Sequence, residues 1–222
     1  MRQPSATDSL FPKPENRAHW ERIYRTKQES EVSWHQDEPE LSLALVCAFS
    51  RPGASVIDIG GGSSVLIGRL VERGFRGCAV LDISEAALGR ARARIGSNAC
   101  QIKWILADIT NAPDDLGTFD VWHDRAVFHF LVTPEARDAY AGLARRTVPV
   151  GGELIIGTFA LNGPEKCSGL EIERYDGCKL STVLGSGFAL RREIQETHVT
   201  PWGTPQQFTY AIFDRVADCT EG

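Results

Sequence analysis

The feature that most constrains the fold is an alternation of short apolar runs with helical segments between residues 54 and 159. Apolar runs at 55–59, 78–81, 102–106, 119–122 and 153–159 read as strands. Helical spacing or capping residues mark 15–27, 39–49, 64–73, 84–95 and 133–147 as helices. Because parallel strands need a crossover connection that is usually a helix, this alternation predicts an α/β fold with a mostly parallel sheet.

The last part of the chain does not continue this alternation of strands and helices. Residues 188–199 and 207–213 both look extended, and the turn-forming residues 201–205 lie between them. They predict an antiparallel strand pair, which would complete a Rossmann-like sheet of seven strands.

Composition limits the classes of protein to consider. The chain has 222 residues, of which 42% are hydrophobic, enough for one full core. A formal net charge of -5 gives no excess of positive charge for a phosphate backbone, so we expect no nucleic-acid partner. No apolar stretch approaches the roughly 18 residues of a membrane span, so no membrane association is expected. The polar, proline-containing start has no signal-peptide pattern, and we predict a cytoplasmic protein.

One domain is expected after a short tail. We predict a flexible tail at 1–14 and a single domain at 15–222. Within it, 15–50 would form an N-terminal helical cap, 54–159 a cofactor-binding core, and 160–216 a substrate loop followed by the antiparallel strands. The oligomeric state is left open. The five histidines lie in separate segments without ligand-like spacing, so no metal site is expected. The six cysteines form no CxxC pair, and packing explains most of them, with Cys167 in a polar loop less certain.

A glycine-rich turn joins the first strand to the next helix. Gly60, Gly61 and Gly62 follow Asp58 there, and glycine permits both a tight turn and a close approach of the backbone to a ligand. A packing turn and a dinucleotide site are the competing interpretations. Gly60 and Gly62 begin a GxGxxG pattern that Val65 does not complete.

Acidic residues follow the next two strands. Asp82 ends the second strand, where a carboxylate can accept hydrogen bonds from both hydroxyls of a ribose, and Ile83 follows it. Asp108 ends the third strand, placed to accept a proton from an adenine amino group, while Ile109 offers an apolar surface to the base. Each acid alone can be a helix cap, but their order along the sheet favours a nucleoside-containing cofactor.

The order of an acid, one residue and then spaced glycines at 58–62 resembles the first motif of the class I methyltransferases. The resemblance covers 54–159 and departs at Ser64, where a third glycine is common. It implies S-adenosylmethionine as the cofactor, with Gly60 and Gly62 near its methionine end, Asp82 on the ribose and Asp108 on the adenine. It also implies that the N-terminal helix, with Trp20 and Tyr24 on one face, closes over the cofactor as a lid.

The segment after the fourth strand resembles two subfamilies. Asp124-Arg125-Ala126 is similar to the Asp-Arg-Gly of thiopurine and other thiol methyltransferases, which also share an early tryptophan segment like 32–36. It also resembles the Asp-Lys-Gly-Thr motif of some protein lysine methyltransferases. We therefore expect a small-molecule nucleophile, with a thiol as the first hypothesis and a protein lysine as the alternative. A cofactor-binding subunit without catalysis is a third.

The candidate catalytic residues under the thiol hypothesis are Arg125, His129 and Asp124. Arg125 can stabilise a thiolate, although an ion pair with Asp124 or Asp120 that merely braces the loop is an equal alternative. His129 is expected to face the pocket as a general base, while His123 would contact the cofactor or a backbone group. Further pocket walls are expected at Trp34, His35, Trp202 and the loop 162–169.

Overall fold

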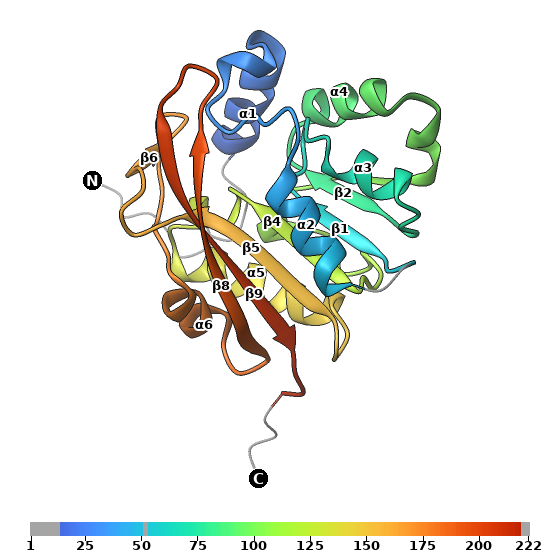
Figure 1. The fold of residues 1–222 in the computed structure, drawn as a ribbon, viewed down its shortest axis with the longest axis vertical. Coiled ribbons are helices and arrows are strands. Elements are labelled where there is room, and N and C mark those ends of the chain that lie inside the picture. Colours follow the sequence, from blue (N-terminus) through green and yellow to red (C-terminus); the bar gives the residue numbers. More distant parts are fainter. Residues whose placement is uncertain (1–13, 51–52, 219–222) are drawn as a thin grey trace, which may run out of the picture.

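The computed structural model describes residues 14–50 and 53–218. It contains a seven-stranded sheet in the order β3-β2-β1-β4-β5-β9-β8 and a separate two-stranded sheet, β6-β7 (Figure 1). The expected Rossmann-like α/β sheet with a C-terminal antiparallel pair is confirmed. The flexible tail expected at 1–14 falls almost wholly outside the described residues.

Five strands make the parallel part of the sheet. They are β1 Val56–Ile59, β2 Ala79–Asp82, β3 Lys103–Leu106, β4 Val121–Arg125 and β5 Glu153–Phe159. Strand β1 lies at the centre, where Asp58 pairs with Val80 of β2 on one side and with His123 of β4 on the other. The carboxyl ends of β1, β2 and β4 therefore meet at one edge, which is where open α/β sheets bind ligands.

The antiparallel strands are long. Strand β8 Phe188–Val199 and strand β9 Pro205–Arg215 form a hairpin, and β9 pairs with the whole length of β5. Figure 1 shows this curved hairpin at one edge of the sheet. Near its turn, Nε2 of His198 lies 2.7 Å from the carbonyl oxygen of Ser33, so the hairpin also holds the N-terminal segment.

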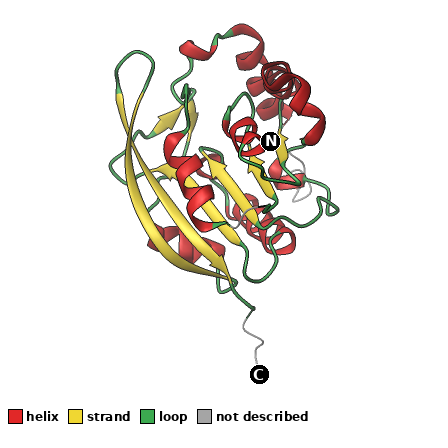
Figure 2. Ribbon diagram, turned by 45° about the vertical axis from the view of Figure 1, so that its right-hand side comes forward, coloured by secondary structure: helices red, strands yellow, loops and turns green. Residues whose placement is uncertain are grey.

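Helices cover both faces of the sheet (Figure 2). They are α1 Pro14–Thr26, α2 Glu40–Phe49, α3 Leu66–Glu72, α4 Glu85–Ile95, α5 Pro134–Thr147 and α6 Gly177–Leu184, with short 3₁₀ turns η1 Glu29–Glu31, η2 Gly96–Gln101, η3 Ile109–Asn111 and η4 Phe128–Phe130. Two predicted caps are present: the side chain of Ser84 accepts from the backbone NH of Ala87, and that of Thr133 from Ala136. Such caps satisfy NH groups that the first helical turn leaves free.

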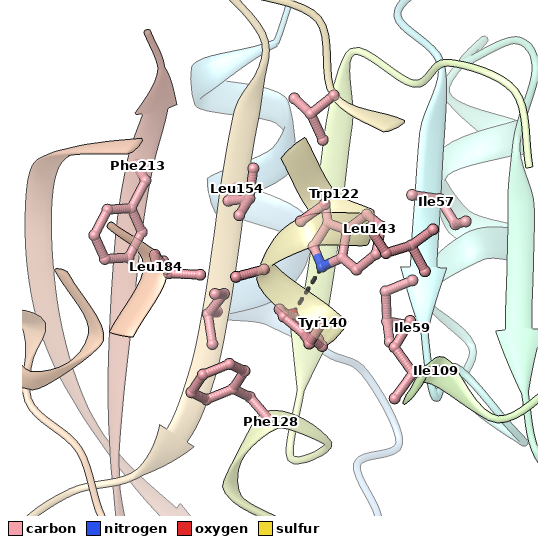
Figure 3. Close-up of a cluster of buried hydrophobic side chains, with 14 of the residues drawn as sticks. Ile57, Ile59, Ile109, Trp122, Phe128, Tyr140, Leu143, Leu154, Leu184 and Phe213 are labelled. Atoms are coloured by element: carbon pink, nitrogen blue, oxygen red, sulfur yellow. Dashed lines mark hydrogen bonds between the residues drawn. The ribbon is translucent and has the colours of Figure 1, made fainter. Parts of the chain in front are cut away.

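The two faces of the sheet bury separate cores because side chains alternate along each strand. Ile57, Trp122 and Leu154 point to the face covered by α5 and α6, where the indole NH of Trp122 donates to the hydroxyl of Tyr140 (Figure 3). Their neighbours Val56, Val121 and Ile155 pack under α2 and α3 on the other face. This second face also carries Asp58 and His123.

The structure differs from the expected elements in three places. Strand β4 continues through Arg125 instead of ending at Trp122, because hydrogen bonding to β1 and β5 on both sides outweighs the polar sequence. Helix α3 is shorter than the expected 64–73, since Ser64 lies within the turn before it. Helix α6 and the β6–β7 hairpin (Lys166–Cys167 and Leu170–Glu171) were not anticipated. Within the described chain, no helix is long and apolar enough to cross a membrane.

Candidate active site

The turn after β1 requires glycine for reasons of space and conformation. Gly60 and Gly62 have φ angles of 62° and 43°, a region that side chains disfavour. A Cβ atom on Gly60 would lie 2.0 Å from Cγ2 of Val127, and one on Gly61 would lie 2.5 Å from Oδ2 of Asp58. The turn is therefore packed tightly against Asp58 of β1 and against Val127, which follows β4, so that a side chain at Gly60 or Gly61 would not fit.

A cavity of about 70 Å³ lies between this turn and the N-terminal segment. It brings together the sequence-predicted Tyr24, Asp58, Gly60, Gly61, His123 and Arg125, and the expected walls Trp34 and His35. Its other lining residues are Val32, Gln36, Pro39, Ser42, Ser63, Ser64 and Leu66. The cavity is smaller than the roughly 300–1,000 Å³ of ligand pockets, so a whole nucleoside cofactor would need the N-terminal cover to shift.

Asp58 and His123 form a buried pair at the floor of this cavity. Each is 2% exposed, and the Nδ1–H of His123 donates to Oδ1 of Asp58 over 2.7 Å. Oδ2 of Asp58 and Nε2 of His123 have no hydrogen-bond partner among the described residues. Because buried polar atoms are normally paired, two such atoms in one cavity point to a polar ligand.

Asp82 lies one strand away, beside Tyr24. Its Oδ1 accepts from the backbone NH of Ser84 over 2.8 Å, and a Cβ atom on Gly62 would lie 2.9 Å from both Oδ2 of Asp82 and the hydroxyl of Tyr24. Burial raises the pKa of Asp82 to about 7, and the nearby charge of Asp58 adds to that shift. Burial also raises the pKa of Tyr24. Ile83 is half-buried beside this group.

Asp108 and Ile109 do not line the cavity. Oδ1 of Asp108 accepts from the backbone NH of Thr110 over 2.9 Å and from its hydroxyl over 2.7 Å, which is the capping alternative for this residue. Ile109 is largely buried in the core on the α5 side, so it has little free surface for a base. Their adenine roles remain predictions.

Arg125 is held at the end of β4 by groups from two other segments, strand β9 and the loop after η1. Its Nε donates to the hydroxyl of Tyr210 and its Nη1 to the carbonyl oxygen of Trp34, both over 3.0 Å. The guanidinium carbon lies 4.7 Å from the ring centroid of Phe208. Its Nη2 is buried with no partner in the described part of the chain. The expected bracing by Asp124 or Asp120 is replaced by these contacts, which leave one N–H of a fixed cation available.

Asp124 braces the backbone instead of facing the cavity. It is fully buried, Oδ1 accepts from the backbone NH of Val127 over 3.0 Å, and Oδ2 accepts from the hydroxyl of Tyr140 over 2.8 Å. Burial raises its pKa to about 6. These hydrogen bonds hold the turn after β4, and the catalytic role expected of Asp124 stays a prediction.

His129 also differs from expectation. Its side chain is fully buried and does not line the cavity, and its Nδ1 accepts from the backbone NH of Phe159 over 3.4 Å. Burial, aided by the positive charge of Arg125, lowers its pKa to about 3. A histidine with this pKa is neutral near pH 7 and is a poor general base.

The N-terminal segment covers the cavity through polar and aromatic contacts. Oε2 of Glu21 accepts from the hydroxyl of Ser84 over 2.7 Å and from the backbone NH of Ala86 over 3.2 Å. Trp20 packs edge-on against Trp34 and Phe130, with centroid distances of 5.6 and 5.1 Å. The cap thus lies where a lid is expected, while Trp20 lies outside the residues that line the cavity.

Several residues around Arg125 had no sequence signal. Tyr210 comes from β9 and bonds Arg125, and its hydroxyl lies 3.4 Å from that of Ser42. Burial raises the pKa of the nearby Glu196, whose Oε2 is unpaired in the described structure. Conversely, Trp202 is 57% exposed in the β8–β9 turn and is not among the residues that line the cavity.

The loop 162–169 contributes one buried cysteine. Cys167 is 5% exposed, and burial raises the pKa of its thiol to about 11. Cys78 is buried too, whereas Cys47, Cys100 and Cys178 are exposed, so packing does not explain those three. No cluster of three or more metal-ligating side chains occurs in residues 14–50 and 53–218.

Comparisons with known proteins agree with this geometry. Residues 56–151 match a family model described as a methyltransferase domain. The eEF1A lysine and N-terminal methyltransferase of Danio rerio is 27% identical over 146 residues, covering 64% of this chain and 21% of that protein. The chain thus spans about a fifth of the length of that curated relative.

Solved structures share the whole fold at low identity. The N-methyltransferase NodS of Bradyrhizobium japonicum, in complex with S-adenosyl-L-homocysteine, has a TM-score of 0.68 at 17% identity, covering 90% of this chain and 98% of its own. A protein that converts a disulfide bond into a thioacetal group during echinomycin biosynthesis has a TM-score of 0.73 at 16% identity, covering 90% and 92%. The protein has the fold shared by these class I methyltransferases, and its residues 56–151 match their methyltransferase domain.

Proposed function

We propose that this enzyme transfers the methyl group of S-adenosylmethionine to a small thiol, with Arg125 holding the thiolate. The observation that carries the proposal is the guanidinium fixed at the end of β4, which lines the cavity of the glycine turn and has one unpartnered N–H. A permanent positive charge near a thiol lowers its pKa and holds the anion in place.

Methyl transfer to a thiolate requires no general base, which suits the residues around the cavity. The cofactor supplies a methyl group on a positively charged sulfur, and displacement at that carbon requires a positioned nucleophile and exclusion of water. A thiolate is a strong nucleophile without a general base, which agrees with the low pKa of His129. The sulfur chemistry of the structurally similar echinomycin-pathway protein gives further support.

The residues of the cavity fit the cofactor. The unpartnered Oδ2 of Asp58 would accept from the ammonium of the methionine end, with His123 fixing the carboxylate through Oδ1. Asp82 does not line the cavity itself, but it is buried at the end of the neighbouring strand and would accept from the ribose hydroxyls. These placements rest on the buried unpaired oxygen of Asp58 and on the position of Asp82 beside the glycine turn.

The test measures where the methyl group goes. Purified protein is incubated with methyl-labelled S-adenosylmethionine and, separately, with small thiols or with native and denatured cell lysate. We expect label in a volatile or extractable thioether. Label fixed to a polypeptide, with none in thioethers, would overturn the proposal.

A protein lysine is the second candidate, favoured by the similarity to the eEF1A lysine and N-terminal methyltransferase of Danio rerio. That relative is matched over a fifth of its length, so its substrate does not transfer directly. A lysine acceptor brings an ammonium group, which the fixed charge of Arg125 would repel. The charge at the end of β4, where Arg125 lies, therefore favours the thiol. The cytoplasmic location expected from the sequence also remains a prediction, to be tested by cell fractionation.

A further inference from the structure

Seven side chains beside the cavity form a closed series of contacts, which we name the aromatic belt. Its members, in order of contact, are Trp20, Phe130, His129, Phe159, Phe208, Arg125 and Trp34. Ring centroids of neighbouring aromatic members lie 4.5 to 5.6 Å apart. Arg125 closes the series by stacking on Phe208 and donating to the carbonyl oxygen of Trp34.

The belt draws on six separate segments that meet at the carboxyl ends of β4 and β5. Trp20 comes from α1, Trp34 from the loop after η1, and Phe130 and His129 from η4. Phe159 ends β5, and Phe208 pairs with it from β9. Since ligands bind at the carboxyl edge of such sheets, the belt lies on the side of the glycine turn where an acceptor would meet the methyl group.

Two members of the belt carry an unused N–H. Nη2 of Arg125 and Nε2 of His129 are buried without a partner among the residues described. His129 is neutral and accepts at Nδ1, so its proton is on Nε2, which makes that atom a donor. Two donors among apolar rings can both donate hydrogen bonds to one small anion. The positive charge of Arg125 disfavours a second cation at the same place.

We infer that the aromatic belt is the acceptor site and that it admits only very small thiols, of the size of hydrosulfide or methanethiol. This inference rests on the proposed thiol methylation and names its substrate class. Neighbouring rings are already at contact distance, so an acceptor with an aryl ring must separate at least one pair. A nucleophile of one or two heavy atoms requires the smallest separation.

The reaction at this site balances without another reactant. The hydrosulfide sulfur forms a bond to the methyl carbon while the bond from that carbon to the sulfonium sulfur breaks. The electron pair of the broken bond remains on the departing sulfur, which becomes a neutral thioether. The products are methanethiol and S-adenosylhomocysteine, and the proton of hydrogen sulfide leaves to solvent when hydrosulfide forms.

The experiment compares thiols that differ in size at saturating S-adenosylmethionine. Hydrosulfide, methanethiol and phenylmethanethiol are used, with kcat/KM expressed per thiolate. We expect methanethiol to exceed phenylmethanethiol by at least about 100-fold. Trp20→Ala, which removes a half-buried member of the belt, should reduce this ratio at least about tenfold.

Trp202→Ala is the matched control, because Trp202 is an exposed tryptophan outside the belt, and it should leave the ratio unchanged. If Trp20→Ala does not fold, Phe130→Leu opens the same part of the belt. Equal turnover of phenylmethanethiol and methanethiol by the wild type would overturn the size restriction and leave thiol methylation intact. Binding of S-adenosylhomocysteine without turnover of any thiol would instead overturn the proposed function itself.

Discussion

The glycine-turn side of the cavity and the aromatic belt are built in opposite ways. On the glycine-turn side, acceptor groups predominate: Asp58 and Asp82 are buried carboxylates on adjacent parallel strands. In the belt, the unpaired groups are the N–H donors of Arg125 and His129, set among apolar rings. The first side therefore suits a ligand with ammonium and hydroxyl donors, and the second suits an anion. The two sides together can thus orient a positively charged methyl donor toward a negatively charged acceptor.

Arg125→Gln gives the largest expected effect and tests whether this division is real. Removing the charge should lower kcat/KM for methanethiol by about 10²–10³-fold, the range seen when one donor to a developing or bound anion is lost. Affinity for S-adenosylhomocysteine should change far less, because the proposed cofactor contacts lie on the other side. Steady-state kinetics and isothermal titration calorimetry measure the two quantities.

Arg191→Gln serves as the control for this variant. Arg191 also stacks over a phenylalanine, Phe49, but it lies on the β8–β9 hairpin and pairs with Glu153 and Asp214. It should leave both quantities near wild type. If Arg125→Gln instead abolished cofactor binding and kept thiol turnover per bound cofactor, Arg125 would belong to the glycine-turn side.

Asp82→Asn is the corresponding change on the glycine-turn side. It should raise the dissociation constant of S-adenosylhomocysteine by about 10- to 100-fold, since hydrogen bonds to a charged group contribute about 1.5–3 kcal/mol. Asp114→Asn, on a side chain that is 88% exposed, is the control. An unchanged dissociation constant in Asp82→Asn would remove Asp82 from the cofactor site.

The same residue predicts a pH dependence. Burial raises the pKa of Asp82 to about 7, so its contribution to the stability of the free protein is largest below its unfolded pKa and is lost as pH rises through about 7. Ribose hydroxyls favour the ionised form, so cofactor binding should release a proton and should weaken as pH falls from about 8 to about 6. Calorimetry in buffers of different ionisation enthalpy detects that proton, and Asp82→Asn should remove it.

The two sides also differ in how far sequence could predict them. The glycine-turn residues are short-range neighbours of strand ends, and the alternation of strands and helices places those ends together, so Asp58, Gly60 and Asp82 were named from the sequence. The belt depends on contacts such as Arg125 with Trp34 and with Tyr210, which are 91 and 85 positions apart. Nothing local in β9 indicates that Tyr210 or Phe208 meets an arginine of β4.

The surroundings of single side chains could not be predicted from the sequence either, for a different physical reason. Asp124 and His129 have residue types that suit catalysis, but full burial and backbone hydrogen bonds decide what they do. Sequence gives the residue type, while burial fixes the pKa and the direction of each hydrogen bond. That is why the position of the motif at the sheet edge follows from the sequence, whereas the burial and the hydrogen bonds of its members do not.

Asp124→Asn should lower the stability of the protein, whereas Arg125→Gln should act on turnover and Asp82→Asn on cofactor binding. An amide can replace only part of the acceptor set that Val127, Phe128 and Tyr140 occupy, so the free energy of unfolding should fall by about 1–3 kcal/mol. Thermal denaturation should show a lower Tm, by about 2–4 °C for each kcal/mol. Tyr140→Phe removes the same contact from the other partner and should give a similar loss. An unchanged Tm with abolished turnover would restore Asp124 as a catalytic residue.

His129 gives the smallest expected effect and distinguishes donor from base. Because burial lowers its pKa to about 3, it stays neutral across the working range, and only its Nε2 proton can serve an acceptor. His129→Phe should lower kcat/KM for methanethiol by about five- to tenfold, the loss of one hydrogen bond from a neutral donor, while His129→Gln keeps an N–H donor and should lose less. In the wild type, no limb of the pH profile between about 5 and 8 should arise from His129. A limb near the ordinary histidine pKa that His129→Gln removes would show that this residue takes a proton from the thiol, and the belt would then supply a base instead of a second donor.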